Sequence, residues 1–210
     1  MKTQRLQTLM QGLILAIFLA TAVNAADKKA MGKMEMTPEM QAQMAKMKEM
    51  GTPGAEHAVF NDVVGKWKVT SKSWMKPGAP EEKSEGTSTM SWVLGGRFIK
   101  QEFKGNWAGQ KFEGMGFCGY DKVKKEYNSI WMDDMMTGIF KSTGQYDAAT
   151  KTIKESGSAS CPMTGEQDKW FRSEFKIGKD ELTYTMWAKD EAGKEFMTMA
   201  MTYTRMNKKK

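Results

Sequence analysis

From Gly65 to Arg205 the chain alternates short runs of apolar and polar residues with a period of two, and turn-forming residues separate the runs. Such alternation places successive side chains on opposite faces of a strand. Because the connections are short, the strands are expected to follow one another up and down, and about ten of them close into a barrel that leaves no free sheet edge. We therefore predict an all-β, antiparallel up-and-down β-barrel with ten strands, at about residues 65–75, 84–94, 97–105, 110–120, 125–133, 137–146, 150–157, 169–178, 181–188 and 195–205.

Lysine positions indicate which face of each strand points outward. In the first strand Lys66, Lys68 and Lys72 share one face, so Trp67 is expected on the inner face. The same test on the other strands gives an inner face that mixes aromatic and polar side chains, and buried polar groups need hydrogen-bond partners or water. We therefore expect an internal site for a small hydrophobic or amphipathic ligand, lined by Trp67, Arg97, Gln101, Phe112, Tyr120, Trp131 and Asp133.

A purely structural interpretation of the same face remains open. Arg97 and Asp133 could form an ion pair that closes one end of the barrel, with the other polar side chains near solvent. A shift of one residue in register would exchange the two faces, so the pattern is a stronger prediction than any single position.

The N-terminus has the pattern of a secretory signal peptide. Lys2 and Arg5 precede the apolar stretch Gly12–Ala20, and small residues follow up to a cleavage site after Ala25. The apolar stretch is about half the length that a membrane-spanning helix needs, so stable membrane insertion is not expected. We predict residues 1–25 as signal peptide, 26–53 as a Met-rich segment and 54–207 as the barrel, in a protein that is periplasmic or secreted.

The segment Met31–Met50 is rich in methionine and predicts a short helix. Thr37 suits the N-cap, Pro38 the first helical position and Gly51 the end. Met36, Met40, Met44 and Met47 follow one helical stripe. Such a stripe is most often an adaptable apolar face or a spacer. The alternatives are a Cu(I) site, because thioethers are soft ligands, and scavenging of oxidants, as in an envelope-stress protein without a ligand.

The remaining composition excludes several classes of function. The net charge of +7 comes partly from lysine runs at Lys28–Lys29 and Lys208–Lys210, which are typical of solvated tails, so nucleic-acid binding is not expected. In an oxidising compartment Cys118 and Cys161 favour a structural disulfide, with two free thiols as the alternative.

Catalytic and cofactor motifs are also missing from the sequence. Asp133 and Asp134 are adjacent in a strand and point to opposite faces, so they cannot act together on one substrate. We therefore lean against an enzyme. The single histidine, His57, precedes the first strand and is expected to act as a cap or hydrogen-bonding group at the barrel base, so neither a zinc site nor any other cofactor is predicted.

Several short motifs match those of a known family in order and spacing, over about residues 53–206. They are Glu56-His57, Gly65-Lys66-Trp67, Leu94-Gly95-Gly96-Arg97-Phe98, Gly119-Tyr120-Asp121, Trp131-Met132-Asp133 and Tyr203-Thr204-Arg205. This region resembles the bacterial domain of unknown function 1579 family. The resemblance implies a calycin-like barrel, similar to lipocalins and fatty-acid-binding proteins, and no known activity. Binding of a small ligand is then an expectation by analogy. The nitrobindin-like branch holds haem through a histidine near the C-terminal end, which this chain lacks.

Overall fold

The computed structural model describes residues 36–107 and 109–206. The predicted signal peptide lies outside these residues, as do Met31 and Met34. No helix in the described part is long and apolar enough to cross a membrane. The elements are helix α2 (Pro38–Gly51), helix α3 (Ala55–Ala58), the 3-10 helix η3 (Val59–Val63) and strands β1 (Gly65–Ser73), β2 (Glu82–Val93), β3 (Phe98–Trp107), β4 (Gln110–Asp121), β5 (Glu126–Asp133), β6 (Phe140–Asp147), β7 (Thr152–Ala159), β8 (Lys169–Lys176), β9 (Glu181–Lys189) and β10 (Glu195–Arg205).

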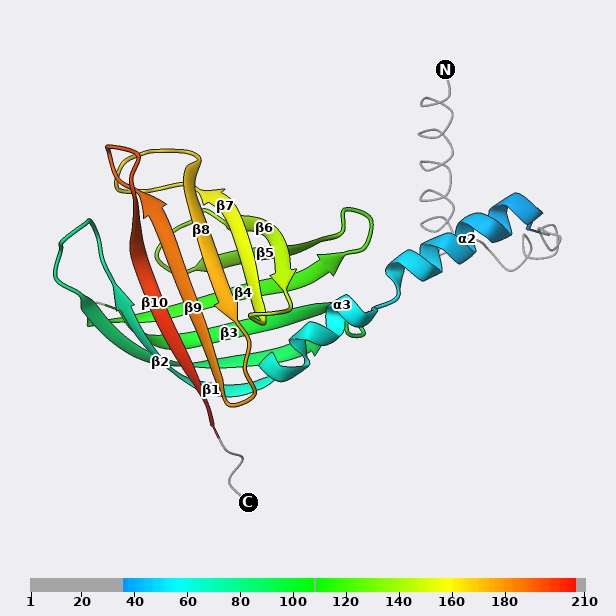
Figure 1. The fold of residues 1–210 in the computed structure, drawn as a ribbon, viewed down its shortest axis with the longest axis horizontal. Helices are drawn as coiled ribbons and strands as arrows, with labels where there is room; N and C mark the ends of the chain where they lie inside the picture. The colour runs from blue at the N-terminus through cyan, green and yellow to red at the C-terminus, as the bar shows by residue number, and fades with distance from the viewer. Residues whose placement is uncertain (1–35, 108, 207–210) are drawn as a thin grey trace, which may run out of the picture. The chain divides into compact units, whose positions relative to one another are not determined.

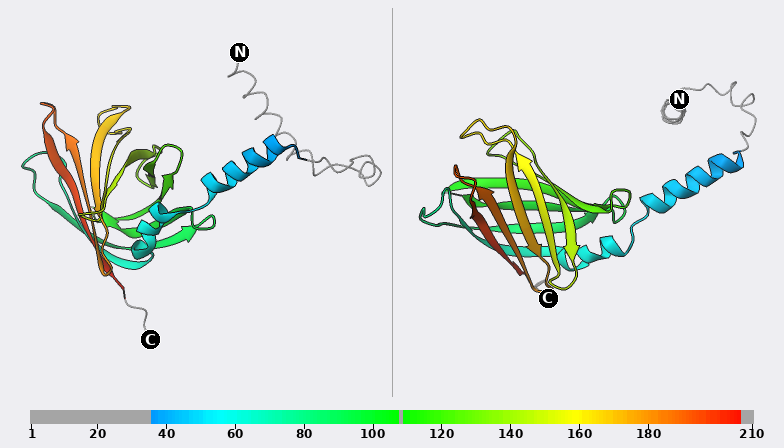
Figure 2. Two further views of the ribbon diagram at one scale, coloured as in Figure 1. Left: turned by 45° about the vertical axis from the view of Figure 1, so that its right-hand side comes forward. Right: turned by 45° about the horizontal axis from the view of Figure 1, so that its top comes forward.

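The ten strands form a closed antiparallel barrel in which each strand pairs with its neighbours in sequence and β1 pairs with β10 (Figure 1). Strands β2–β5 make one wall, and β7–β10 run across them as the other wall (Figure 2). The predicted barrel is therefore confirmed. The largest difference is at β6, which begins at Phe140 instead of residue 137, because Thr137 and Gly138 belong to the preceding loop.

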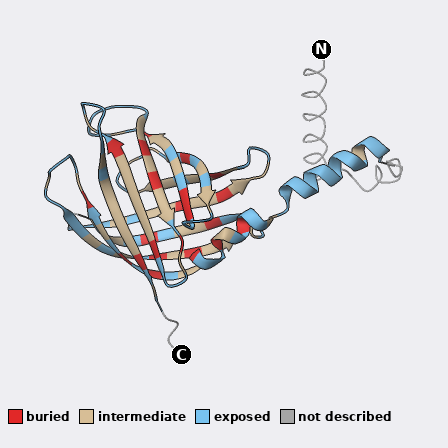
Figure 3. Cartoon of the chain, viewed as in Figure 1, coloured by how far each residue is buried: buried red, intermediate tan, exposed pale blue. Residues whose placement is uncertain are grey.

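One end of the barrel, which we call the base, is closed by α3 and η3. Phe60 of η3 packs edge-to-face against Trp92 and Tyr127, with ring centroids 6.1 Å and 5.5 Å away. The indole Nε1 of Trp67 donates to the Val63 carbonyl at 2.9 Å. Buried residues gather along the strands around this end (Figure 3), and its least exposed side chains, all at 0–2%, are Phe60, Val63, Trp67, Val69, Ile153 and Leu182.

His57 has the structural role that the sequence predicts. Its side chain is buried, and its Nδ1 accepts a hydrogen bond from the backbone N–H of Gly54 at 3.1 Å. Burial, the largest influence, lowers the pKa of His57, and this favours the neutral ring that can accept that bond.

Arg205, at the end of β10, connects several segments at the base. Its guanidinium lies 4.1 Å above the ring of Trp67. It donates from Nε to the Lys179 carbonyl at 2.6 Å, from Nη1 to the Val64 carbonyl at 2.9 Å and from Nη2 to the Asp62 carbonyl at 2.5 Å. One side chain thus links β10 to η3, to the segment before β1 and to the turn before β9.

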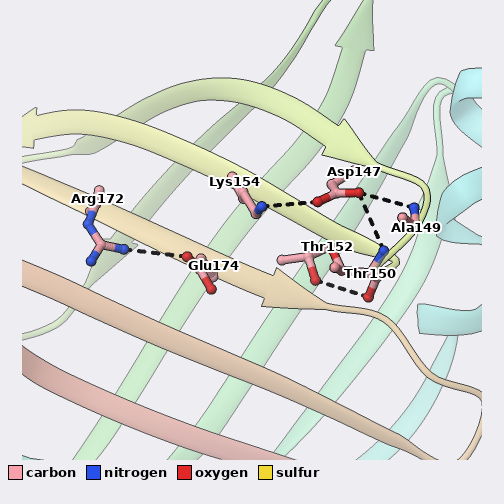
Figure 4. Close-up of polar contacts among 7 residues, drawn as sticks. All are labelled: Asp147, Ala149, Thr150, Thr152, Lys154, Arg172 and Glu174. Atoms are coloured by element: carbon pink, nitrogen blue, oxygen red, sulfur yellow. Dashed lines mark hydrogen bonds and ion pairs between the residues drawn. The ribbon is translucent and has the colours of Figure 1, made fainter.

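The outer face of the barrel carries charged side chains, as the lysine positions predict. In the turn between β6 and β7, Asp147 accepts from the backbone N–H groups of Ala149 and Thr150 and pairs with Lys154 at 3.0 Å (Figure 4). Such exposed ion pairs stabilise a fold by about 0–1 kcal/mol each, so the outer face contributes mainly solubility.

Helix α2 begins with the predicted cap, because Thr37 Oγ1 accepts from the backbone N–H of Met40 at 3.2 Å. None of its residues is buried (Figure 3). Met44 and Met47 are 48% and 63% exposed, and Met36 lies just before the first turn. The predicted helix is confirmed, and three of its methionines, Met44, Met47 and Met50, are exposed.

Candidate functional site

A ring of polar side chains crosses the barrel interior above the base. The register places on the inner face one such residue from each strand between β2 and β9. We call this ring the polar belt; it consists of Ser88, Gln101, Cys118, Ser129, Ser142, Glu155, Ser173 and Tyr184.

Glu155 is the acidic member of the belt. It follows the core residue Ile153 by two positions on β7 and therefore shares its inward direction. Ser129 Oγ donates to its Oε1 at 2.7 Å, and Ser142 Oγ donates to its Oε2 at 3.1 Å. Burial raises the pKa of Glu155, and the two hydroxyl hydrogen bonds oppose that rise by stabilising the carboxylate.

A second hydrogen-bonded group lies on the opposite side of the belt. Gln101 Nε2 donates to Ser88 Oγ at 3.2 Å and to the hydroxyl oxygen of Tyr203 at 3.3 Å. The Tyr203 hydroxyl in turn lies 3.5 Å from Met201 Sδ as a donor. Burial raises the pKa of Tyr203 to about 12, so this hydroxyl remains protonated at neutral pH.

Three members of the belt keep accessible surface although they point inward. Cys118, Glu155 and Tyr184 point inward from the wall of a closed barrel, yet each is only half-buried. A side chain in that position keeps accessible surface only where it faces room for a water-sized molecule. Burial raises the pKa of both the Cys118 thiol and the Tyr184 phenol, so both stay protonated at neutral pH.

Aromatic side chains line the interior on the other side of the belt from the base. The Trp131 ring covers Gly114, where a Cβ would lie 2.2 Å from its Cζ2 atom, and its Nε1 donates to Asp133 Oδ2 at 3.0 Å. Edge-to-face pairs continue this lining, with 5.6 Å between the rings of Phe103 and Phe112 and 5.8 Å between those of Phe140 and Phe171.

The predicted ligand-binding residues fall into three places. Gln101 belongs to the polar belt, and Phe112, Trp131 and Asp133 belong to the aromatic lining. Trp67 and Tyr120 lie at the base, where Tyr120 contacts the rings of His57 and Tyr127 with centroid distances of 6.0 Å and 5.0 Å.

Arg97 lies outside the interior, contrary to the alternation in the sequence. It is exposed in the turn between β2 and β3, and its Nη1 donates to the Leu94 carbonyl at 2.9 Å. Leu94, Gly95 and Gly96 adopt positive φ angles of 50°, 66° and 81°, which turn the chain before the strand begins. The alternative ion pair with Asp133 is also wrong, since Asp133 accepts from Trp131 and from the backbone of Met135.

Glu155 is the residue that sequence analysis missed. The run Thr152–Ala159 is polar on both faces, and a carboxylate is seldom expected inside a barrel, although Lys154 and Glu155 lie on opposite faces. The available signal is Ile153, the one large apolar residue of the strand, since a period of two places Glu155 and Gly157 on the same face.

The expected disulfide is not formed, because both cysteines are free. Cys118 points into the barrel, whereas Cys161 lies in the loop between β7 and β8. That loop and the loop before β6 enclose a depression of about 460 Å³ lined by Met136, Thr137, Gly138, Ser160, Cys161, Pro162, Gly165, Glu166 and Gln167. A hydrogen bond with the Thr164 hydroxyl lowers the pKa of Cys161.

Within residues 36–107 and 109–206, no three His, Cys, Asp or Glu side chains lie close enough together to hold a metal ion. The belt instead offers hydroxyls, one amide, one carboxylate and a protonated thiol. These groups can orient a bound molecule by hydrogen bonding.

Comparison with known proteins gives the family and supports the fold. Residues 52–205 match the family described as a protein of unknown function, DUF1579, and the chain belongs to it. No curated protein matches the chain. The structure of Rv2717c from M. tuberculosis is similar, with a TM-score of 0.56 and 13% identity over 74% of this chain and 100% of that one. A protein of unknown function from the DUF3598 family of Nostoc punctiforme PCC 73102 aligns with a TM-score of 0.22 and 9% identity, over 73% and 100% of the two chains.

Proposed function

We propose that this DUF1579 protein binds a small amphipathic molecule inside its barrel. The observation that supports the proposal is the polar belt, in which Cys118, Glu155 and Tyr184 point inward between the base and the aromatic lining and yet stay only half-buried. Ligand sites in barrels combine apolar walls with a few polar groups that fix orientation, and the belt and lining supply both.

The energetics of the belt also support binding. An unliganded barrel gains most from an apolar interior, because each polar group taken from water without a full set of partners costs about 1–3 kcal/mol. The base achieves such an interior, with Trp67 and Leu182 at 0% exposure. The belt instead keeps a carboxylate and an amide a short way above it. Every buried side-chain N or O atom of the described residues has a hydrogen-bond partner, and the remaining hydrogen-bonding capacity of these two groups is available to a bound molecule.

Native mass spectrometry of the protein purified without denaturation tests the proposal directly. We expect an added organic mass that disappears after unfolding and refolding, and that returns on incubation with an extract of the source cells. Trp131→Ala should weaken this uptake because it removes part of the aromatic lining. Arg97→Ala is the matched control, since Arg97 lies outside the interior. Equal uptake by both variants, or a bare chain in every preparation, would contradict the proposal.

Helix α2 supports a second candidate function, Cu(I) binding or oxidant scavenging. Met44, Met47 and Met50 of this helix and Met36 just before it are exposed, so their sulfur atoms are accessible to an ion or an oxidant. Replacing Met36, Met40, Met44 and Met47 together by Leu should abolish Cu(I) binding measured by competition with a chromophoric chelator, and should leave ligand uptake by the barrel unchanged. Equal Cu(I) affinity in both proteins would show that the helix has another role.

Export is the remaining part of the proposal, and the order of charged, apolar and small residues before Ala26 supports it. Intact mass measurement of the protein from fractionated cells should find a chain that starts at Ala26 outside the cytoplasm. A full-length chain in the cytoplasmic fraction would contradict it.

A further inference from the structure

The polar belt contains one group that is charged at neutral pH in its ordinary state, Glu155, and that group has no cationic partner. None of the ion pairs of the described residues includes Glu155. The titratable groups of the belt near it are the protonated thiol of Cys118 and the protonated phenol of Tyr184, neither of which carries positive charge. The interior therefore holds an unbalanced acid.

Burial raises the pKa of Glu155, whereas the hydrogen bonds that it accepts favour its charged form. Each carboxylate oxygen accepts one serine hydroxyl, from Ser129 at 2.7 Å and from Ser142 at 3.1 Å. An ionised carboxylate offers about four lone-pair positions, so each oxygen retains capacity for one more donor. The serines thus hold the carboxylate in place without saturating it.

The neighbours of Glu155 on the adjacent strands leave room for that further donor. The directly paired residues are Gly144 on β6 and Ser173 on β8, which are among the smallest side chains of the inner face. A Cβ at Gly144 would lie 1.9 Å from the backbone oxygen of Lys154, so this position tolerates no side chain. Nothing bulky at either paired position stands over the carboxylate.

Aromatic groups complete the surroundings of this acid. Phe175 pairs with Tyr184, and both lie next to Ser173 on the inner face of β8 and β9. Cations are attracted both to carboxylates and to the faces of aromatic rings. An anionic ligand would instead bring a second negative charge beside Glu155, which is costly where the dielectric constant is low.

From this arrangement we propose that the ligand is an organic cation, with an ammonium group that pairs with Glu155 and an apolar body that contacts the aromatic lining. This inference rests on the proposed function, because it names the class of molecule that the barrel binds. The chain as a whole carries a net charge of +7, but most lysines of the described residues are exposed to solvent, where salt screens charges beyond about 10 Å. Selection for a cation is then local to the belt.

Three probes with the same ten-carbon body and different head groups test the proposal: decylammonium, decanol and decanoate. Their affinities for the full chain are measured by isothermal titration calorimetry at neutral pH. We expect decylammonium to bind about tenfold or more tightly than decanol, since both can donate to the carboxylate but only the ammonium adds the attraction of opposite charges, and decanoate to bind most weakly.

Glu155→Gln is the decisive variant, because the amide keeps the size of the side chain and removes the charge. The preference for decylammonium over decanol should fall to about unity, with decanol affinity retained. Glu113→Gln is the matched control: it removes a carboxylate from the outer face, where Glu113 pairs with Lys104 at 3.2 Å, and should leave all three affinities unchanged. If circular dichroism shows that Glu155→Gln does not fold, the order of the three probe affinities for the wild type tests the proposal instead.

The outcomes separate this inference from the function on which it rests. Binding of decanol with no gain for decylammonium would overturn the cation and leave the ligand-binding barrel intact. The same holds if Glu155→Gln keeps the full preference for decylammonium. If none of the three probes binds the wild type, the proposed function and the cation fail together.

Discussion

The base and the polar belt are neighbouring parts of one barrel interior, and they differ in almost every property. At the base, large apolar side chains such as Phe60 and Leu182 are fully buried, and the one histidine is held by the backbone. In the belt, small polar side chains surround a carboxylate that is only half-buried. In both regions, every second residue of a strand points inward. The difference therefore comes from which residue types occupy these inner positions.

This contrast shows how the barrel separates stability from chemistry. Burial at the base contributes hydrophobic stabilisation, at about 25 cal/mol per Å² of apolar surface removed from water. The belt adds hydrogen bonds whose net contributions are about 0.5–1.5 kcal/mol each. Substitutions at the base should therefore affect folding, and substitutions in the belt should affect mainly what the barrel binds.

The largest expected effect is at the base. Phe60→Ala removes a fully buried ring that packs on Trp92 and Tyr127, and should lower the free energy of unfolding by about 3–5 kcal/mol in urea denaturation. Val123→Ala is the control, because Val123 is 76% exposed and should change stability by less than about 0.5 kcal/mol. A small loss for Phe60→Ala would mean that the base is not the stabilising end.

An intermediate effect is expected in the aromatic lining. Gly114→Ala places a methyl group against the Trp131 ring, and should destabilise the barrel by about 1–3 kcal/mol while shifting tryptophan fluorescence. Gly138→Ala is the matched control, since the nearest atom to its Cβ would be 3.7 Å away. An unchanged spectrum for Gly114→Ala would show that Trp131 does not cover this position.

The belt should show a smaller effect that depends on pH. Burial raises the pKa of Glu155 above its unfolded value of about 4.5, so the folded state holds this proton more tightly than the unfolded state does. As pH rises through these values, the wild type should lose stability relative to Glu155→Gln, in which the group does not titrate. Urea denaturation of both proteins between about pH 4 and pH 8 measures the difference in the free energy of unfolding. If the wild type instead gains stability relative to Glu155→Gln as pH rises, the pKa of Glu155 is lowered by folding and not raised.

The smallest effect is expected in helix α2. Met44→Ala and Met47→Ala should each change the free energy of unfolding of the barrel by less than about 0.5 kcal/mol, because neither side chain is buried. Met90→Ala is the contrasting control, since Met90 is 3% exposed in the core and should cost about 2–5 kcal/mol. A large loss at Met44 would indicate that the helix stabilises the barrel.

Most of the fold could be predicted from the sequence because alternation, turn residues and lysine positions agree along the strands. The N-cap at Thr37 and the role of His57 were also predictable, since both depend on contacts within three residues. The register of β3–β5 followed from the same pattern, and it brought Gln101, Trp131 and Asp133 to the interior.

The site was predicted only in part, for two physical reasons. The alternation of inner and outer positions would place Arg97 on the inner face. However, positive φ angles at Leu94–Gly96 turn the chain, and Arg97 lies in this turn, before the regular alternation of the strand begins. Glu155 lies in a strand whose two faces are nearly equally polar, so from the sequence only the position of Ile153 indicates its direction, and the hydrogen bonds from Ser129 and Ser142 show it in the structure. Neither the missing disulfide nor the free thiols could be inferred from cysteine spacing, which carries no geometry.

The pairing of β1 with β10 also determines when the molecule can finish folding. Trp67 pairs with Arg205, so the contact that closes the barrel joins the first strand to the last and depends on residues far apart in the chain. Contacts of this kind form slowly, and synthesis delivers the N-terminal strands first. Until β10 emerges, β1 and β9 remain as open edges that can pair with other chains, so a nascent or truncated chain needs protection that the complete barrel does not.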